Sequence, residues 1–111
     1  MKDRTISILG EKWEILFKRE SEDKELENTN GYADCSTRKI IICNLQKEPG
    51  SLASLGKIMN KTLRHEIIHA ALFESGLLNN SDWAKNEECV DWIALQFPKL
   101  QEIFKKEGID K

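Results

Sequence analysis

The segment TLRHEIIHAAL, residues 62–72, contains both histidines of the chain, His65 and His69. Because each residue of an α-helix advances by about 100°, these histidines lie one turn apart on the same side. Glu66 points to a different side, among apolar residues, where an unpaired carboxylate is costly. The spacing His-Glu-x-x-His is that of zinc peptidases, in which the histidines bind the metal and the glutamate is the general base. The segment therefore predicts a core helix that carries a zinc site.

A catalytic zinc site needs a third protein ligand, and the chain has no further histidine. A metzincin would have glycine and histidine where Leu72 and Ser75 stand, so that subclass is excluded. In a later helix the helical wheel places Glu87 at the edge of the buried stripe and Glu88 toward solvent. We therefore expect Glu87 as the third ligand, with Glu88 as the alternative.

Asp91 follows Glu87 by one helical turn and lies on the same face of the expected helix. A carboxylate in this position can accept the outer N–H of a ligating histidine, which fixes the tautomer of that histidine. The non-functional interpretation of Glu87 and Asp91 is an exposed acidic first turn that interacts favourably with the helix dipole.

Two hairpins are expected before the histidine helix. Residues 4–9 and 12–18 alternate apolar and polar side chains on either side of Gly10, which predicts the first hairpin. Residues 31–43 contain a short strand, a polar turn and the β-branched strand 39–43, which predict the second. The charged residues 19–30 between the hairpins are expected to form a solvated loop.

Helices are expected in the second half of the chain. The pattern is helical from Leu52 to about Glu74, with Ser51 as the N-cap and Gly76 as the stop. A further helix is expected to begin at Ser81 or Asp82, and Pro98 either kinks it or begins a new helix. The expected buried stripe of this helix consists of Trp83, Val90, Ile93, Ala94 and Phe97.

This order of elements predicts an α+β fold, in which a small antiparallel sheet packs on the histidine helix and a C-terminal helix follows. The 111 residues are one domain's worth of sequence, so we assign residues 1–111 to a single domain.

Composition excludes some classes of function. The net charge is −2, so no basic field favours nucleic acid, and no nucleic-acid partner is expected. The sequence shows neither a secretory leader nor a membrane-spanning stretch, and its three cysteines match no zinc-knuckle spacing. These features predict a cytoplasmic protein with reduced thiols, no membrane partner, and cysteines that act as small buried hydrophobes. The oligomeric state is left open.

Three segments together resemble the small ImmA/IrrE-type zinc metallopeptidases, gluzincins found among phage and prophage proteins. The segments are GYADCSTRKIIICN, KTLRHEIIHAALFESGL and NEECVDWIALQF, within residues 31–97. The resemblance implies a minimal zincin fold with Zn2+ between two helices, and a Glu-x-x-x-Asp signature supplied by Glu87 and Asp91. It also implies cleavage of an intracellular protein, in some relatives a phage or mobile-element repressor, in a bacterial cell or phage-infected host. Relatives often carry a DNA-binding or sensor domain that is not expected here.

The expected activity is metal-assisted hydrolysis of a peptide bond, with Glu66 as the general base. Tyr32, the only tyrosine, is the candidate transition-state donor. Strand 39–43, if it lies at a sheet edge over the cleft, is expected to pair with an extended substrate.

The alternative function is a non-catalytic partner-binding protein, such as an antirepressor or a phage accessory factor, that keeps zinc for stability. Trp83, Trp92 and Phe97 are candidates for its interface, although a role in the core is the simpler expectation for these side chains.

Overall fold

The computed structural model describes residues 2–45 and 52–111, and in this part of the chain strands precede helices. Strands β1 (Arg4–Ile8) and β2 (Glu11–Lys18) form one antiparallel hairpin. Strands β3 (Gly31–Asp34) and β4 (Lys39–Cys43) form the other. Leu9 and Gly10, between β1 and β2, both have positive φ, as in the turns whose twist matches a two-stranded ribbon. The α+β class and both hairpins are confirmed.

The two hairpins join through a parallel pairing of β2 with β4, so the sheet is mixed and has the order β1-β2-β4-β3. The expectation of a purely antiparallel sheet is therefore wrong at this junction. Strand β4 takes an interior position because its residues 40–43 are all buried, which suits a strand with neighbours on both sides. The less apolar β3 is left at the edge. The condition for residues 39–43 to pair with a substrate, a position at the sheet edge, is therefore not met.

The connection between β2 and β3 is more ordered than the expected solvated loop. It contains two short 3-10 helices, η1 (Glu20–Glu22) and η2 (Lys24–Glu27). Leu26 is buried there and packs with Ile41 and Cys43. This small cluster is separate from the main core, and it anchors the charged segment to the sheet.

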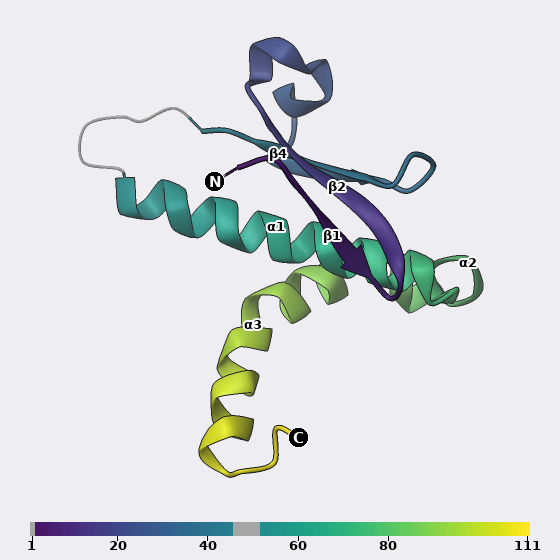
Figure 1. Cartoon of the computed structure of the whole chain (residues 1–111), viewed down its shortest axis with the longest axis vertical. Helices are drawn as coiled ribbons and strands as arrows, with labels where there is room; N and C mark the ends of the chain where they lie inside the picture. Colours follow the sequence, from purple (N-terminus) through teal and green to yellow (C-terminus); the bar gives the residue numbers. More distant parts are fainter. Residues whose placement is uncertain (1, 46–51) are drawn as a thin grey trace.

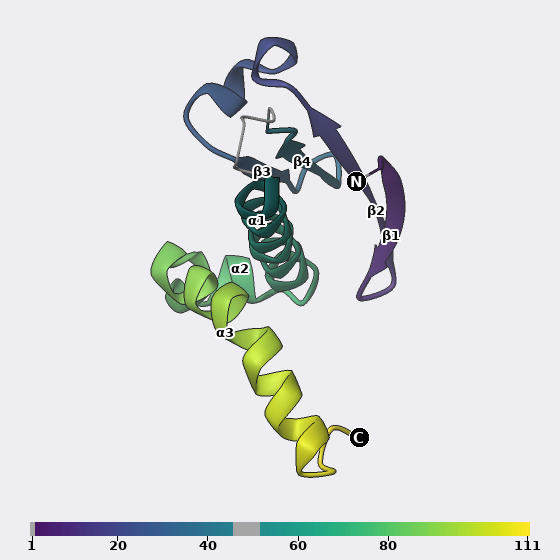
Figure 2. The ribbon, with the colours of Figure 1, turned by 90° about the vertical axis from the view of Figure 1, so that its left-hand side faces the viewer.

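Helix α1 (Leu52–Glu74) lies along one face of the sheet (Figures 1 and 2). Gly76 has φ 85°, and its N–H donates to the carbonyl of Phe73, so the predicted helix stop is confirmed. The predicted N-cap, Ser51, lies outside the described residues. The main core between α1 and the sheet consists of Ile8, Trp13, Ile15, Ile40, Ile42, Leu63 and Ala70.

Glu74 ties the C-terminal end of α1 to the sheet. Trp13 Nε1 donates to Glu74 Oε2 at 2.7 Å. Arg38, in the turn between β3 and β4, donates through Nε to Oε2 at 2.7 Å and through Nη2 to Oε1 at 3.2 Å. These bonds join a strand, a turn and the helix at one carboxylate, and they fix how α1 lies on the sheet.

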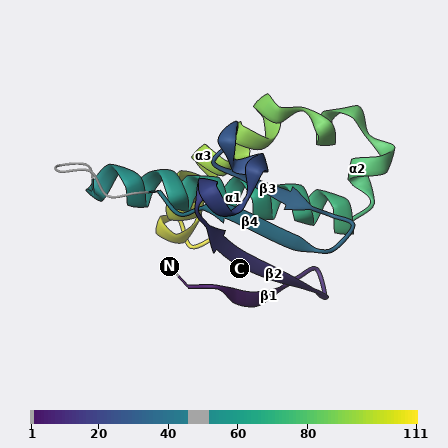
Figure 3. The same cartoon turned by 90° about the horizontal axis from the view of Figure 1, so that it is seen from above.

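The last part of the chain forms α2 (Leu77–Asn80), a short 3-10 helix η3 (Asp82–Lys85) and α3 (Glu87–Lys106). The predicted start of the last helix at Ser81 or Asp82 is wrong. The N-cap of α3 is Asn86, whose side chain accepts the N–H of Cys89 at 2.8 Å. Figure 3 shows α2 and α3 on the side of α1 away from β1 and β2, with β3 as the strand nearest to them.

Pro98 lies inside α3, which continues past it to Lys106. Proline has no N–H, so it cannot serve the carbonyl of Ala94 one turn earlier. Arg64 of α1 donates to this oxygen instead, with Nε 2.8 Å away. Beyond the first turns of α3 the helix runs away from the sheet toward the C-terminus (Figures 1 and 2).

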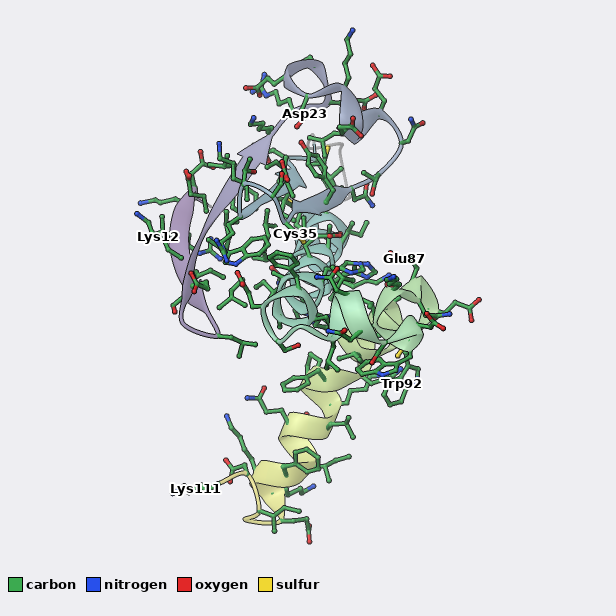
Figure 4. The ribbon with its side chains drawn as sticks, turned by 90° about the vertical axis from the view of Figure 1, so that its right-hand side faces the viewer. Lys12, Asp23, Cys35, Glu87, Trp92 and Lys111 are labelled. Carbon is green, nitrogen blue, oxygen red and sulfur yellow. The ribbon has the colours of Figure 1, made fainter. Side chains whose placement is uncertain are left out.

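The buried stripe expected for the last helix is only partly correct. Val90 and Ala94 are buried, but Trp83 and Phe97 are 48% and 54% exposed. Trp92 is 57% exposed, and Figure 4 shows it on the outer side of α3. The expectation that these large side chains serve the core is therefore wrong. In the described part of the chain, neither α1 nor α3 combines the length and apolarity that a membrane crossing requires.

The first prediction concerns the pH dependence of stability. The hydrogen bond from Arg38 is the main cause that lowers the pKa of Glu74; burial acts in the opposite direction, and Trp13 lowers the pKa further. The pKa in the folded state thus lies below the unfolded value of about 4.3. The stabilisation is complete above that value and is lost as pH falls through the folded-state pKa.

We therefore expect Glu74→Gln to lower the free energy of unfolding at neutral pH. The difference from wild type should shrink as pH falls below about 4. Urea titrations at a series of pH values measure this difference, with Glu102→Gln on the exposed part of α3 as the control. A difference that does not depend on pH would contradict the role given to Arg38.

The second prediction concerns the close approach of β3 to α1. A Cβ atom on Gly31 would lie 2.8 Å from Cγ2 of Thr62 and 3.0 Å from the carbonyl oxygen of Ile41. We expect Gly31→Ala to reduce the free energy of unfolding by about 1–3 kcal/mol, because the strand and the helix must move apart. Thr62→Ser removes Cγ2 but keeps the hydroxyl that donates to the carbonyl of Ile58.

The double variant Gly31→Ala/Thr62→Ser should regain part of the lost stability in the same urea titrations. Gly56→Ala is the matched control, because a Cβ there meets no atom within 4 Å. Alanine is favoured over glycine inside a helix, so this control should be neutral or stabilising. If Gly31→Ala lowered the free energy of unfolding equally with and without Thr62→Ser, the clash with Cγ2 of Thr62 would be contradicted.

Candidate metal centre

Helix α1 presents His65 and His69 one turn apart, as the sequence predicts. Both imidazoles are mostly buried, with 17% and 18% of each side chain exposed. Their Nε2 atoms lie 3.1 Å apart, and their ring centroids are separated by 4.7 Å. The helix thus directs one nitrogen of each ring to the same point.

Glu87, the first residue of α3, reaches this point from the other helix. Its Oε1 lies 2.7 Å from Nε2 of His69 and 3.1 Å from Nε2 of His65. The structure therefore brings the expected third residue to the two histidines. The alternative residue, Glu88, is exposed and lies outside this group.

Asp91 lies one turn farther along α3 and faces the other nitrogen of His65. Its Oδ1 is 3.3 Å from Nδ1 of His65 and 3.2 Å from Nζ of Lys61. When Nδ1 of His65 donates its proton to Asp91, Nε2 presents a lone pair toward His69 and Glu87. Asp91 thus lies where a partner for a ligating histidine is expected.

Hydrogen bonds and charges lower the pKa of Glu87 and the pKa of Asp91. Burial alone would raise the pKa of Glu87, but the hydrogen bonds and charges of His69 and His65 outweigh burial. The same opposition holds for the pKa of Asp91, where Lys61 and His65 outweigh burial. Both carboxyl groups are therefore ionised at neutral pH.

Three atoms that can donate a lone pair converge in this group. Nε2 of His65, Nε2 of His69 and a carboxylate oxygen of Glu87 all lie within 4.8 Å of one another. Ligand atoms about 2.0 Å from a tetrahedral zinc ion lie roughly 3.3 Å apart, close to the separations found here. Two nitrogens and one carboxylate oxygen also form a donor set that zinc accepts. The residues therefore fit a zinc ion, with room for a fourth ligand.

Glu66 lies beside this group and is buried, with 7% of the residue exposed. In the described part of the chain no hydrogen bond reaches its carboxylate. Burial raises the pKa of Glu66 above its usual value, although the neighbouring His65 and His69 act in the opposite direction. A carboxyl group with a raised pKa is suited to accept a proton and release it again.

A cleft of about 470 Å³ opens over the four side chains. One wall comes from β3 and its flanks, and another from α2. Besides His65, Glu66, His69 and Glu87, the lining residues are Thr29, Gly31, Tyr32, Ala33, Cys35 and Leu78. The group is thus accessible to a ligand of small-peptide size.

Tyr32 lines this cleft, but its hydroxyl is engaged elsewhere. The phenol donates to Asp23 and packs with Leu26 and Ile41, whereas α1 packs with a different cluster. Figure 4 shows Asp23 in the segment that contains η1 and η2, far from Glu87. Burial, and then the bond to Asp23, raises the pKa of Tyr32 to about 12. This placement does not support the expected role of Tyr32 as a transition-state donor.

The cysteines are free thiols in three different environments. Cys43 is buried as expected, Cys89 is half-buried, and Cys35 lines the cleft. Burial raises the pKa of Cys35, so its thiol is protonated. The position of Cys35 at the site was not predicted, because it depends on the turn after β3. Lys61 was not singled out by the sequence either, although its position one turn before His65 was a signal for its contact with Asp91.

Comparison with protein-family models gave no match, and comparisons with curated proteins and with solved structures gave none. The functional interpretation therefore depends on the sequence and on the geometry of this centre.

The third prediction distinguishes the two adjacent glutamates. We expect the wild-type chain to bind one zinc ion and Glu87→Ala to bind it at least about 10-fold more weakly, because one of three protein ligands is lost. Glu88→Ala is the matched control, and its zinc affinity should equal that of wild type. Competition with a chromophoric chelator measures both values. Equal losses in the two variants would show that Glu87 is not a ligand.

Proposed function

We propose that this protein is a zinc-dependent metallopeptidase that hydrolyses peptide bonds of an intracellular protein. The observation that carries the proposal is the convergence of His65, His69 and Glu87 in an open cleft, beside a buried Glu66 whose carboxylate has no hydrogen-bond partner among the described residues. The resemblance of residues 31–97 to ImmA/IrrE-type peptidases supports the same activity. It makes a regulator of a phage or mobile element the proposed substrate and the cytoplasm the proposed location.

In this proposal His65, His69 and Glu87 hold zinc, which supplies Lewis acidity toward the scissile carbonyl and lowers the pKa of water to about 7. Glu66 accepts a proton from the attacking water while the water oxygen forms a bond to the carbonyl carbon. Glu66 then delivers this proton to the peptide nitrogen as the carbon–nitrogen bond breaks. The products are a carboxylic acid and an amine, so atoms and protons balance.

The edge strand β3 is the proposed contact for the substrate backbone, in place of residues 39–43. Within residues 2–45 and 52–111, β3 pairs with β4 on one side only, and it lines the cleft beside the candidate metal centre. An extended peptide can add to such an edge through main-chain hydrogen bonds. The short length of β3 limits this pairing to a few residues of substrate.

A second candidate function is partner binding without catalysis, with zinc kept for stability. The exposure of Trp83, Trp92 and Phe97 favours this candidate, because large aromatic side chains are enriched at protein interfaces. Both candidates contain zinc, so metal analysis does not separate them, whereas turnover does.

The fourth prediction therefore concerns Glu66. Glu66→Gln keeps the shape of the side chain but removes its ability to accept a proton. We expect zinc affinity close to wild type and a stability that is equal or higher, because no hydrogen bond to the described residues is lost and a buried acid is removed. Turnover should fall by at least about 100-fold. Proteins of a bacterial cell extract, incubated with each variant, are analysed by mass spectrometry for new amino termini.

A metal chelator and the control Glu88→Ala complete this experiment. Fragments that require both the metal and Glu66 support the peptidase. Equal cleavage by wild type and Glu66→Gln contradicts the role of Glu66. Bound zinc without any fragments from the wild-type protein favours the partner-binding candidate.

A further inference from the structure

Lys61 and His65 contact the same atom of Asp91. Lys61 lies one turn before His65 on α1, and its Nζ is 3.2 Å from Oδ1 of Asp91. The same oxygen is 3.3 Å from Nδ1 of His65. One carboxylate oxygen of α3 is therefore held between a lysine and a candidate metal ligand that both belong to α1.

We propose that Lys61 is a positioning residue for the metal centre, which holds the carboxylate of Asp91 against His65. The inference depends on the proposed zinc site and extends it to a residue that is neither one of the three candidate ligands nor part of the lining of the 470 Å³ cleft. Lys61 acts through Asp91, and Asp91 acts through Nδ1 of His65.

The exposure of the pair explains why such a contact is needed. About 40% of the Asp91 side chain is exposed, so water competes for its oxygens. A neutral imidazole N–H is a modest partner for a carboxylate in contact with water. A cation at the same oxygen restricts the rotamers of Asp91 to the one that faces His65. His65 then keeps its proton on Nδ1 and its lone pair on Nε2, as a zinc ligand requires.

The contact of Lys61 with Asp91 also predicts which property changes when Lys61 is replaced: zinc affinity or folding stability. An exposed lysine–carboxylate pair contributes little to folding stability, because water and salt screen it. If Lys61 only joined α1 to α3, its removal would lower stability slightly at most and leave zinc affinity unaltered. If Lys61 positions Asp91, its removal changes zinc affinity, and only when Asp91 is present.

The fifth prediction tests this with the full chain and zinc alone as the probe. Zinc affinity is measured by competition with a chromophoric chelator for Lys61→Met, Lys61→Arg, Asp91→Ala and the double variant Lys61→Met/Asp91→Ala. Lys57→Met, an exposed lysine one turn earlier on α1, is the matched control. Urea unfolding in the presence of a chelator checks the fold of each variant, and the absorption of bound cobalt(II) reports on ligand geometry.

Loss of a partner that orients a ligand weakens metal binding by about 10- to 100-fold, and we expect this loss for Asp91→Ala. Lys61→Met should lose less, about three- to tenfold, with an altered cobalt spectrum. Lys61→Arg and Lys57→Met should stay within about twofold of wild type, because the first keeps a cation there and the second is remote. The double variant should bind zinc no more weakly than Asp91→Ala.

Three results would overturn the inference. Zinc affinity of Lys61→Met equal to or tighter than wild type would show that Lys61 does not assist the site. A further loss in the double variant would show that Lys61 acts by a route other than Asp91. Absence of zinc binding by the wild-type chain would reject the metal centre itself, and this result is distinct from the other two.

Discussion

The position of helix α1 on the sheet is the constraint on which the rest of the structure depends. Leu63 and Ala70 of this helix are buried in the core, and helical periodicity places Glu66 between them on the same face. A helix that packs in this way must carry a carboxylate into the interior. Glu74 fixes the position from the other end, through Trp13 and Arg38. The close contact of Gly31 with Thr62 fixes β3 beside the helix, and the cleft opens along that strand.

The features that the sequence predicted correctly are local ones. The alternation around Gly10, the β-branched residues 39–43 and the stop at Gly76 each depend on neighbours in the chain. One contact between distant residues was also expected. A catalytic zinc site needs a third ligand, and periodicity places Glu87 and Asp91 on one helix face, so both were expected near the histidines. The parallel join of β2 with β4 was missed, because strand order depends on contacts between residues far apart in the chain. The exposure of Trp83 and Phe97 was missed for a related reason, since an amphipathic pattern does not show whether a partner element is present.

In helix α3, a residue far away in the chain compensates for the hydrogen bond that a proline removes. Pro98 leaves the carbonyl of Ala94 without its usual helical partner, and the sequence left open whether the helix bends or restarts there. Arg64 supplies the missing donor from α1, immediately before His65 in the chain. The same stretch of α1 therefore contacts α3 through Arg64, through Lys61 and through His65. These contacts set the two helices in the relation that brings Glu87 and Asp91 to the histidines.

Two glutamates on α1, Glu66 and Glu74, show that environment, and not residue type, decides the role of a carboxyl group. Glu74 accepts hydrogen bonds from Arg38 and Trp13, so its pKa is lowered and its charge serves the fold. Glu66 has no such partner among the described residues; burial raises its pKa, and its carboxylate faces a cleft. A folded protein retains an uncompensated buried acid at a cost in stability. The combination of that cost with a neighbouring set of candidate metal-binding atoms agrees with the proton-transfer role proposed for Glu66, whereas the contacts of Glu74 are those of a structural carboxylate.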